Sequence, residues 1–315
     1  MQLKLVLRKG RQPMERHPLV TVVTPCLNAA PFIARTIQSV LNQNYPHLEY
    51  IVMDCGSKDG TVDILEAWRG CLQYVSAPDN GTADAINRGF LRSHGTVFGW
   101  LNADDIYRPG AIEAAVRSLV SRPESAVVYG KAVWIDAEDE VLGSYPTVSP
   151  YNAAHWAREC FICQPAAFMT RRAFEAVGML DPDLQSAFDY DLWIRLSRAN
   201  LFTAIPDVLA ASRMHANNKS LGRRRQVFQE VLRILRRHFG FVPVSWIYSY
   251  LSFLRDGKDQ FFQPLRHSPM TYLASLPVGS CYNYKHVWRY SREWASNIVS
   301  RNSGQISHDP NARMA

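Results

Sequence analysis

The stretch Val97–Gly110, VFGWLNADDIYRPG, decides the fold of this chain. Its first five residues are apolar apart from one glycine, which is typical of a buried strand. Polar side chains follow at once, namely Asn102, Asp104 and Asp105. Two adjacent carboxylates repel each other, so a strand that ends in them is expected to set them against a positive partner.

The same kind of strand alternates with helical segments on the N-terminal side. Short apolar runs rich in β-branched residues are followed by segments with apolar residues at helical spacing. Such alternation indicates parallel βαβ units and a doubly wound α/β sheet, whose ligands bind at the carboxyl ends of the strands. The pattern predicts strands at 19–24, 48–54, 72–76 and 96–101, with helices near 33–41, 61–68, 83–91 and 111–120.

The second half of the chain is less regular. A strand and hairpin are predicted at 126–143, a strand and short helix at 164–178, and a helix at 189–199. Residues 221–301 hold 13 Lys and Arg against 4 Asp and Glu, with many aromatic residues, and we expect a helical basic extension there. The predicted organisation is a lead segment at 1–18, a main domain at 19–220, the extension at 221–301 and a disordered tail at 302–315.

Composition and charge limit the classes of molecule that this protein is expected to bind. A net charge of +7 over 315 residues favours an anionic partner, which could be a nucleotide, a nucleic acid or a lipid. No recognised nucleic-acid module accompanies the charge, so we expect no nucleic-acid partner. No apolar run reaches the length of about 18 residues needed for a membrane span, and the basic N-terminus lacks an apolar core. The closest stretch, Phe239–Leu254, is too short and too polar to span but is aromatic enough to lie at a membrane interface. We expect a cytoplasmic protein with reduced cysteines, in peripheral contact with the inner face of the plasma membrane through its aromatic, basic extension.

The acidic motifs allow a structural and a functional interpretation. Asp104 and Asp105 could be solvated loop acids, or they could bind Mg²⁺ or Mn²⁺ beside a diphosphate, since these ions prefer oxygen ligands. Asp54 opens the turn MDCGSKDGT and could cap a helix, or it could accept the imide N–H of uracil.

The remaining motifs are equally ambiguous when each is taken alone. Asp84 could complement the positive end of its helix, and Asp189 could cap the helix that follows it. Arg213 and His215 lie in the stretch RMHANNKS, which could be only a basic surface.

Taken together, five stretches in order resemble glycosyltransferase family 2, which has the GT-A fold. The resemblance covers residues 19–220, about two-thirds of the chain. The stretches are TVVTPCLNAAPFIARTIQSVLNQNYPHLEYIVMDCGSKDGTVDIL from residue 21, SAPDNGTADAINRGF from 76, GWLNADDIYRPGAI from 99, CQPAAFMTRRAFEAVGMLDPDL from 163 with FDYDLWIRL from 188, and RMHANNKS from 213.

The resemblance implies an inverting enzyme that moves a sugar from a UDP- or GDP-linked donor to an acceptor hydroxyl in polysaccharide or glycan assembly. The acceptor would be a glycan or a lipid-linked glycan, and the enzyme could form an oligomer. Asp189 would be the catalytic base, and Asp104, Asp105 and His215 would bind Mn²⁺ or Mg²⁺. Donor contacts would come from Thr24, Pro25, Asn28, Asp54, Ser57, Asp84, Asn102 and Arg213.

Two positions depart from the family pattern. Asn102 stands where the D-x-D motif begins with Asp, and Phe188 stands where the family has Glu before the base. Two other functions stay open: a catalytically inactive nucleotide-sugar-binding protein and a sugar nucleotidyltransferase. The second normally has a glycine-rich phosphate loop after its first strand, whereas TPCLNAAPF has no glycine.

Overall fold

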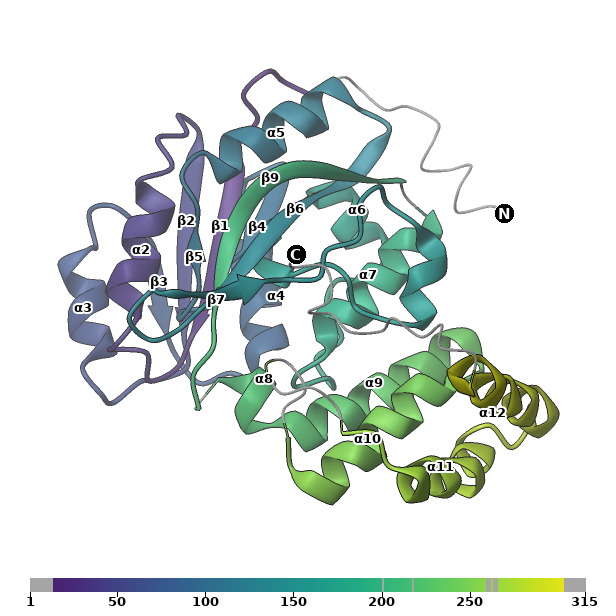
Figure 1. The fold of residues 1–315 in the computed structure, drawn as a ribbon. Coiled ribbons are helices and arrows are strands. Elements are labelled where there is room, and N and C mark those ends of the chain that lie inside the picture. The colour runs from purple at the N-terminus through teal and green to yellow at the C-terminus, as the bar shows by residue number, and fades with distance from the viewer. Residues whose placement is uncertain (1–13, 200, 217, 259–261, 263–265, 303–315) are drawn as a thin grey trace. The chain divides into compact units, whose positions relative to one another are not determined.

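The computed structural model describes residues 14–199, 201–216, 218–258, 262 and 266–302. It divides into two compact units (Figure 1). The first unit comprises Met1–Ala153 and Cys160–His215, and the second comprises Ala154–Glu159 and Ala216–Ala315. Most of the predicted lead segment and, apart from residue 302, the whole predicted tail lie outside the described residues.

The first unit is built on one mixed sheet, which confirms the predicted α/β class. Along the sheet the strands run in the order β3-β2-β1-β4-β8-β6-β9-β5, and β7 pairs with β6. The pairings among β1 to β4 are parallel, as predicted, whereas β8 is antiparallel to both β4 and β6. The strands are β1 Val20–Cys26, β2 Leu48–Asp54, β3 Gln73–Ser76, β4 Val97–Trp100, β5 Ile106–Tyr107, β6 Ser125–Ile135, β7 Val141–Ser144, β8 Ala167–Thr170 and β9 Leu201–Arg213.

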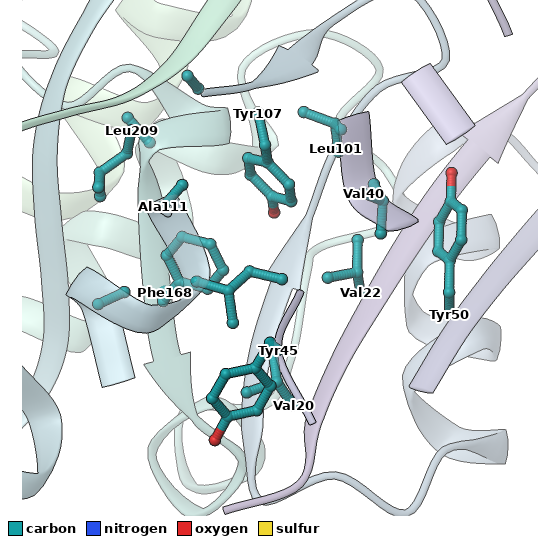
Figure 2. Packing of buried hydrophobic residues seen from close by; sticks show 14 of the residues in the cluster. Val20, Val22, Val40, Tyr45, Tyr50, Leu101, Tyr107, Ala111, Phe168 and Leu209 are labelled. Atoms are coloured by element: carbon teal, nitrogen blue, oxygen red, sulfur yellow. The ribbon is translucent and has the colours of Figure 1, made fainter. Parts of the chain in front are cut away.

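Helices cover both faces of this sheet because successive strand residues point to opposite sides. Val20 and Val22 of β1 pack in one cluster with Val40 of α2 and Ala111 of α5 (Figure 2). On the opposite face, Phe98 of β4 stacks on Phe90 of α4 at 4.1 Å. The helices of this unit are α2 Ile33–Leu41, α3 Thr61–Ala67, α4 Thr82–Arg92, α5 Ala111–Ser121, α6 Arg171–Ala176 and α7 Phe188–Ala199, with 3₁₀ turns at Ala153–Ala157 and Gln164–Ala166.

Helix α4 lies very close to the sheet at Gly89. A Cβ atom at this position would lie 2.6 Å from a methyl carbon of Val23 and 3.2 Å from Met53. Glycine therefore allows the helix backbone to rest directly on β1 and β2. This close contact fixes α4 against β1 and β2, near the ends of the strands that form the site.

The second unit is helical, and its core differs from the sequence-based expectation. Its helices are α8 Lys219–Gly222, α9 Arg224–Phe239, α10 Val244–Asp256, α11 Pro269–Tyr282 and α12 Val287–Asn302. Helix α10 lies in the aromatic segment expected at a membrane interface, yet it buries Ile247, Tyr248 and Tyr250. These side chains therefore belong to the core of the unit. No helix in the described ranges has both the length and the apolar character needed to cross a membrane.

Candidate active site

The polar loops predicted from the sequence meet at one edge of the sheet. Strand β1 pairs with β2 so that Cys26 lies opposite Asp54, and Val23 of β1 lies opposite Trp100 of β4. Because these strands are parallel, their carboxyl ends share one edge, as the fold class predicts. This edge is the candidate active site.

Asp54 organises the turn after β2. One carboxylate oxygen accepts hydrogen bonds from the backbone N–H groups of Gly56 and Ser57, at 3.1 and 3.0 Å, and from the Ser76 hydroxyl at 2.6 Å. The other oxygen accepts from the Ser57 hydroxyl. With only 1% of Asp54 exposed, the carboxylate shapes the loop. The contact of Asp54 with uracil stays a prediction.

Asn28 and Ser57 link the first two loops. The backbone N–H of Asn28 donates to the Ser57 hydroxyl at 2.7 Å, and Lys58 N–H donates to the Asn28 side-chain oxygen at 3.0 Å. Asn28 has a φ of 50°, a left-handed conformation that asparagine tolerates better than most residues. The two loops therefore form one hydrogen-bonded rim.

Thr24 and Pro25 lie inside strand β1, buried behind this rim. Thr24 is fully buried, and its hydroxyl lies 3.1 Å from the Tyr50 hydroxyl inside the core. Pro25 is a buried residue of β1. The Thr24 hydroxyl is therefore used within the sheet. The donor contacts of Thr24 and Pro25 stay predictions.

Asp104 and His215 form the partly exposed centre of the edge. The His215 Nε2 lies 3.0 Å from a carboxylate oxygen of Asp104. The His215 side chain is 19% exposed and the Asp104 side chain 25%. The Phe32 ring, at the N-cap of α2, lies 4.8 Å from the His215 ring and supports it. Two residues that are far apart in the sequence thus present an oxygen and a nitrogen ligand side by side.

Asp105 points inward instead. Its two oxygens accept hydrogen bonds from the backbone N–H of Arg213 at 2.8 Å and from the Asn102 amide at 3.0 Å. Burial, reinforced by the charge of Asp104, raises the pKa of Asp105 to about 8 despite these hydrogen bonds. Proton uptake relieves the repulsion that the adjacent acids create. The predicted role of Asp105 as a direct metal ligand does not fit, because both oxygens are used inside.

Arg213 is also committed within the protein. Its guanidinium donates to the carbonyl oxygens of Asp104 and Asp136 at 2.8 and 2.6 Å, and it forms an ion pair with Asp139. It lies 5.0 Å from the centre of the Phe32 ring and is 1% exposed. The predicted contact of Arg213 with a diphosphate is therefore replaced by a supporting role behind Asp104.

Asp139 lies in the hairpin that the sequence predicted at 126–143, but its partners were missed. Besides Arg213, Asp139 binds Arg35 of α2 at 3.0 Å. Burial acts to raise the pKa of Asp139, but hydrogen bonds and charges from Arg213 and Arg35 outweigh it and lower the pKa. No local sequence pattern connects these residues, because they come from α2, β9 and the β6–β7 turn.

Gln164 is a second residue that the motifs did not identify. Its amide donates to the Trp100 carbonyl at 2.7 Å, and its oxygen accepts from Asn102 at 3.2 Å. Asn102 therefore bridges Gln164 and Asp105. This placement explains how an amide can replace a carboxylate at the first position of the motif: it donates to both neighbours.

Asp189 lies in the first turn of α7 and accepts a hydrogen bond from Tyr190 N–H at 2.8 Å. Burial raises the pKa of the Cys163 thiol well above its usual value, and the charges of Asp105 and Asp189 act in the same direction. Cys163 therefore lies within electrostatic reach of both acids. Asp84 pairs with Arg88 of its own helix at 2.9 Å and accepts a hydrogen bond from Asn80 N–H at 2.9 Å. Its contact with the donor stays a prediction.

The site offers a divalent cation two ligands. Within the described ranges, no group of three or more His, Cys, Asp or Glu side chains is suited to hold a metal ion. The Asp104 carboxylate and the His215 imidazole nonetheless fit Mn²⁺ or Mg²⁺, since such ions commonly take few protein ligands and complete their shell with phosphate and water.

The fold and the acidic strand edge define an α/β protein of the GT-A type. Residues 21–178, half of the chain, match the family model described as glycosyl transferase family 2, and the chain belongs to this family of glycosyltransferases. An uncharacterized glycosyltransferase of Rickettsia prowazekii is 29% identical over 206 residues, which are 63% of this chain and 65% of the relative. Chondroitin synthase of Escherichia coli is 28% identical over 215 residues, 66% of this chain and 31% of the relative. The chain thus spans less than two-thirds of these relatives.

Solved structures support the fold. TarS of S. aureus, residues 1–349 in complex with UDP-GlcNAc, has a TM-score of 0.58 at 13% identity, with 92% of this chain and 93% of that chain covered. The mannosyltransferase PcManGT of Pyrobaculum calidifontis, in complex with GDP-Man and Mn²⁺, has a TM-score of 0.55 at 19% identity, with 98% and 88% covered.

Proposed function

We propose that this protein is an inverting glycosyltransferase that moves a sugar from a UDP- or GDP-linked donor to an acceptor hydroxyl during polysaccharide or glycan assembly. The observation that carries the proposal is the Asp104–His215 pair, with its 3.0 Å separation, at the carboxyl edge of the parallel strands. Relatives named for chondroitin and hyaluronan synthesis, together with structural neighbours bound to UDP-GlcNAc and GDP-Man, support it.

Donor binding would use the rim formed by Asn28 and Ser57 together with the Asp104–His215 pair. Asp104 and His215 would hold Mn²⁺ or Mg²⁺, which supplies positive charge to a departing diphosphate when bound. Asp105, Asn102 and Arg213 would act as positioning residues, because each fixes the loop that presents Asp104.

Asp189 would be the general base. The start of a helix favours a charged carboxylate, and an ionised acid can accept the proton of an acceptor hydroxyl as that oxygen attacks the anomeric carbon. The Tyr190 N–H holds one carboxylate oxygen at 2.8 Å, which fixes the side chain for this task. One such base suffices for inversion, so no covalent nucleophile is needed.

The acceptor would be a glycan or a lipid-linked glycan. The strongly basic second unit supports an anionic membrane surface as the place where a lipid-linked acceptor is met.

A donor screen tests the proposal. UDP- and GDP-sugars would be assayed for donor hydrolysis and for thermal stabilisation, with and without Mn²⁺. We expect one donor to stabilise the protein and to be hydrolysed only with metal. Stabilisation without any turnover, even with acceptors, would favour the inactive binding protein, and formation of a nucleotide-sugar from a sugar phosphate and a nucleoside triphosphate would favour the nucleotidyltransferase.

A further inference from the structure

Two turns of the second unit are joined at one end. The side chain of Asn283, between α11 and α12, accepts a hydrogen bond from Val242 N–H at 2.7 Å and donates to the Val242 carbonyl at 3.0 Å. Asn283 is 2% exposed, so this link lies inside the unit. It holds the segment after α9 against the end of α11, where the turn into α12 begins.

This end exposes large apolar side chains to an unusual degree. Trp288 is 77% exposed and Tyr284 is 58% exposed, while Val287 and Phe239 beside them are 41% and 37% exposed. Single exposed apolar residues are ordinary, but here four gather at two linked helix junctions, with Phe239 at the end of α9, Tyr284 before α12, and Val287 and Trp288 at its start. We call these four residues the patch; such a gathering is of the kind that marks an interaction site.

Cations surround the patch. The Arg236 guanidinium and the Lys285 ammonium lie 5.1 and 5.7 Å from the Tyr284 ring centre, and the Arg289 guanidinium lies 4.0 Å from the Phe241 ring centre. Residues 236–244 and 283–293 contain five Lys and Arg against one acid, Glu293, whose carboxylate accepts the Val244 N–H at 3.0 Å. We call the patch and its cations, Arg236, Phe239, Tyr284, Lys285, Val287 and Trp288, the basic aromatic tip.

We propose that the basic aromatic tip binds the surface of an anionic phospholipid bilayer. Trp and Tyr favour the headgroup region because their rings are apolar and their edges polar, and Val287 and Phe239 add apolar area that water does not favour. Arg236 and Lys285 would pair with lipid phosphates. A second copy of the chain is a poor occupant, because two such surfaces would repel each other.

The inference rests on the membrane contact proposed above and names its surface. It also moves that contact away from α10, whose aromatic residues are largely buried, to the tip. Lipid binding needs no donor, metal or acceptor, so it can be measured separately from glycosyl transfer.

Vesicle flotation of the full chain tests the inference. Vesicles of phosphatidylcholine alone would be compared with an equal mixture of phosphatidylcholine and phosphatidylglycerol. We expect binding to the mixed vesicles at low salt, with a steep loss as salt rises because exposed charges are screened. Trp288→Ala should weaken binding by about tenfold, since it removes the most exposed ring. Arg236→Ala with Lys285→Ala should weaken it by about fivefold for each charge removed.

A matched control removes the same charge elsewhere. Arg223 and Arg225 line a hollow of about 450 Å³ near the start of α9, roughly 20 Å along the helix from Arg236. Arg223→Ala with Arg225→Ala should bind vesicles nearly as well as the wild type. Equal losses from both pairs, unchanged binding by the Trp288→Ala protein, or capture by single-stranded RNA with no vesicle binding would overturn the inference. Failure of donor turnover would leave it intact.

Discussion

The buried guanidinium of Arg213 forms an ion pair with Asp139, whose side chain is 37% exposed at the tip of the β6–β7 turn. The same guanidinium donates to the backbone carbonyl of Asp104 at 2.8 Å. The surface carboxylate of Asp139 therefore neutralises the Arg213 charge, and Arg213 in turn fixes the loop that carries Asp104, the candidate metal ligand.

Asp139→Asn is expected to weaken both stability and activity. The substitution removes the carboxylate that pairs with the buried Arg213 guanidinium. We expect the free energy of unfolding, measured with urea, to fall by about 1–2 kcal/mol. The lowered pKa of Asp139 means that this contribution is present at neutral pH and disappears as pH falls through the acid range. A positioning role also predicts weaker Mn²⁺ binding in the folded variant. Glu138→Gln, in the same turn, is the control, and Mn²⁺ affinity equal to wild type in the Asp139 variant would show that the role is only structural.

Asp104→Asn is expected to abolish metal-dependent turnover while leaving the fold intact. The side chain is partly exposed and pairs with His215, so an amide of the same size fits but binds a divalent cation poorly. Titration with Mn²⁺ and a donor hydrolysis assay would measure the effect, and circular dichroism would check folding. Full wild-type activity in EDTA would contradict the metal assignment.

Asp189→Asn separates a structural role from catalysis. The helix α7 begins at Phe188, so Asp189 lies in its first turn and does not cap it as expected, and asparagine can accept the same hydrogen bond from Tyr190 N–H. A structural role therefore predicts nearly normal stability and turnover. A general base predicts normal folding and nucleotide binding with a rate loss of about 10²–10⁴-fold. Single-turnover kinetics would distinguish these outcomes, and a variant that keeps more than about a tenth of wild-type turnover would exclude Asp189 as the base.

Gly89→Ala is expected to destabilise the first unit although alanine favours helices. The gain in helix propensity is about 1 kcal/mol, but the new methyl group would lie 2.6 Å from Val23 and force the helix from the sheet, at a cost of about 1–3 kcal/mol. The control is Gly70→Ala, because a Cβ there meets nothing within 4 Å. Denaturant midpoints would compare the two, and equal stability of both variants would contradict the close-contact argument.

The sequence by itself determined the parallel half of the sheet and its ligand edge. Predicted strand 48–54 coincides with β2, Leu48–Asp54, because a short buried strand has a strong local pattern and a clear polar end. Asn102, Asp104 and Asp105 were located for the same reason. The strand β9, Leu201–Arg213, was missed, since its mixed burial gives no clear alternation.

Only the tertiary structure decided which of these side chains face a ligand. Asp104 and Asp105 are neighbours in sequence, yet one pairs with His215 at the surface and the other accepts the Arg213 N–H inside. The difference arises because β9 pairs with β5, the short strand that follows the two acids, so that Arg213 at the end of β9 and His215 just beyond it reach the acids. Long-range pairing of this kind leaves no local sequence pattern, so the roles of Asp139 and Gln164 could be found only once the strands were in place.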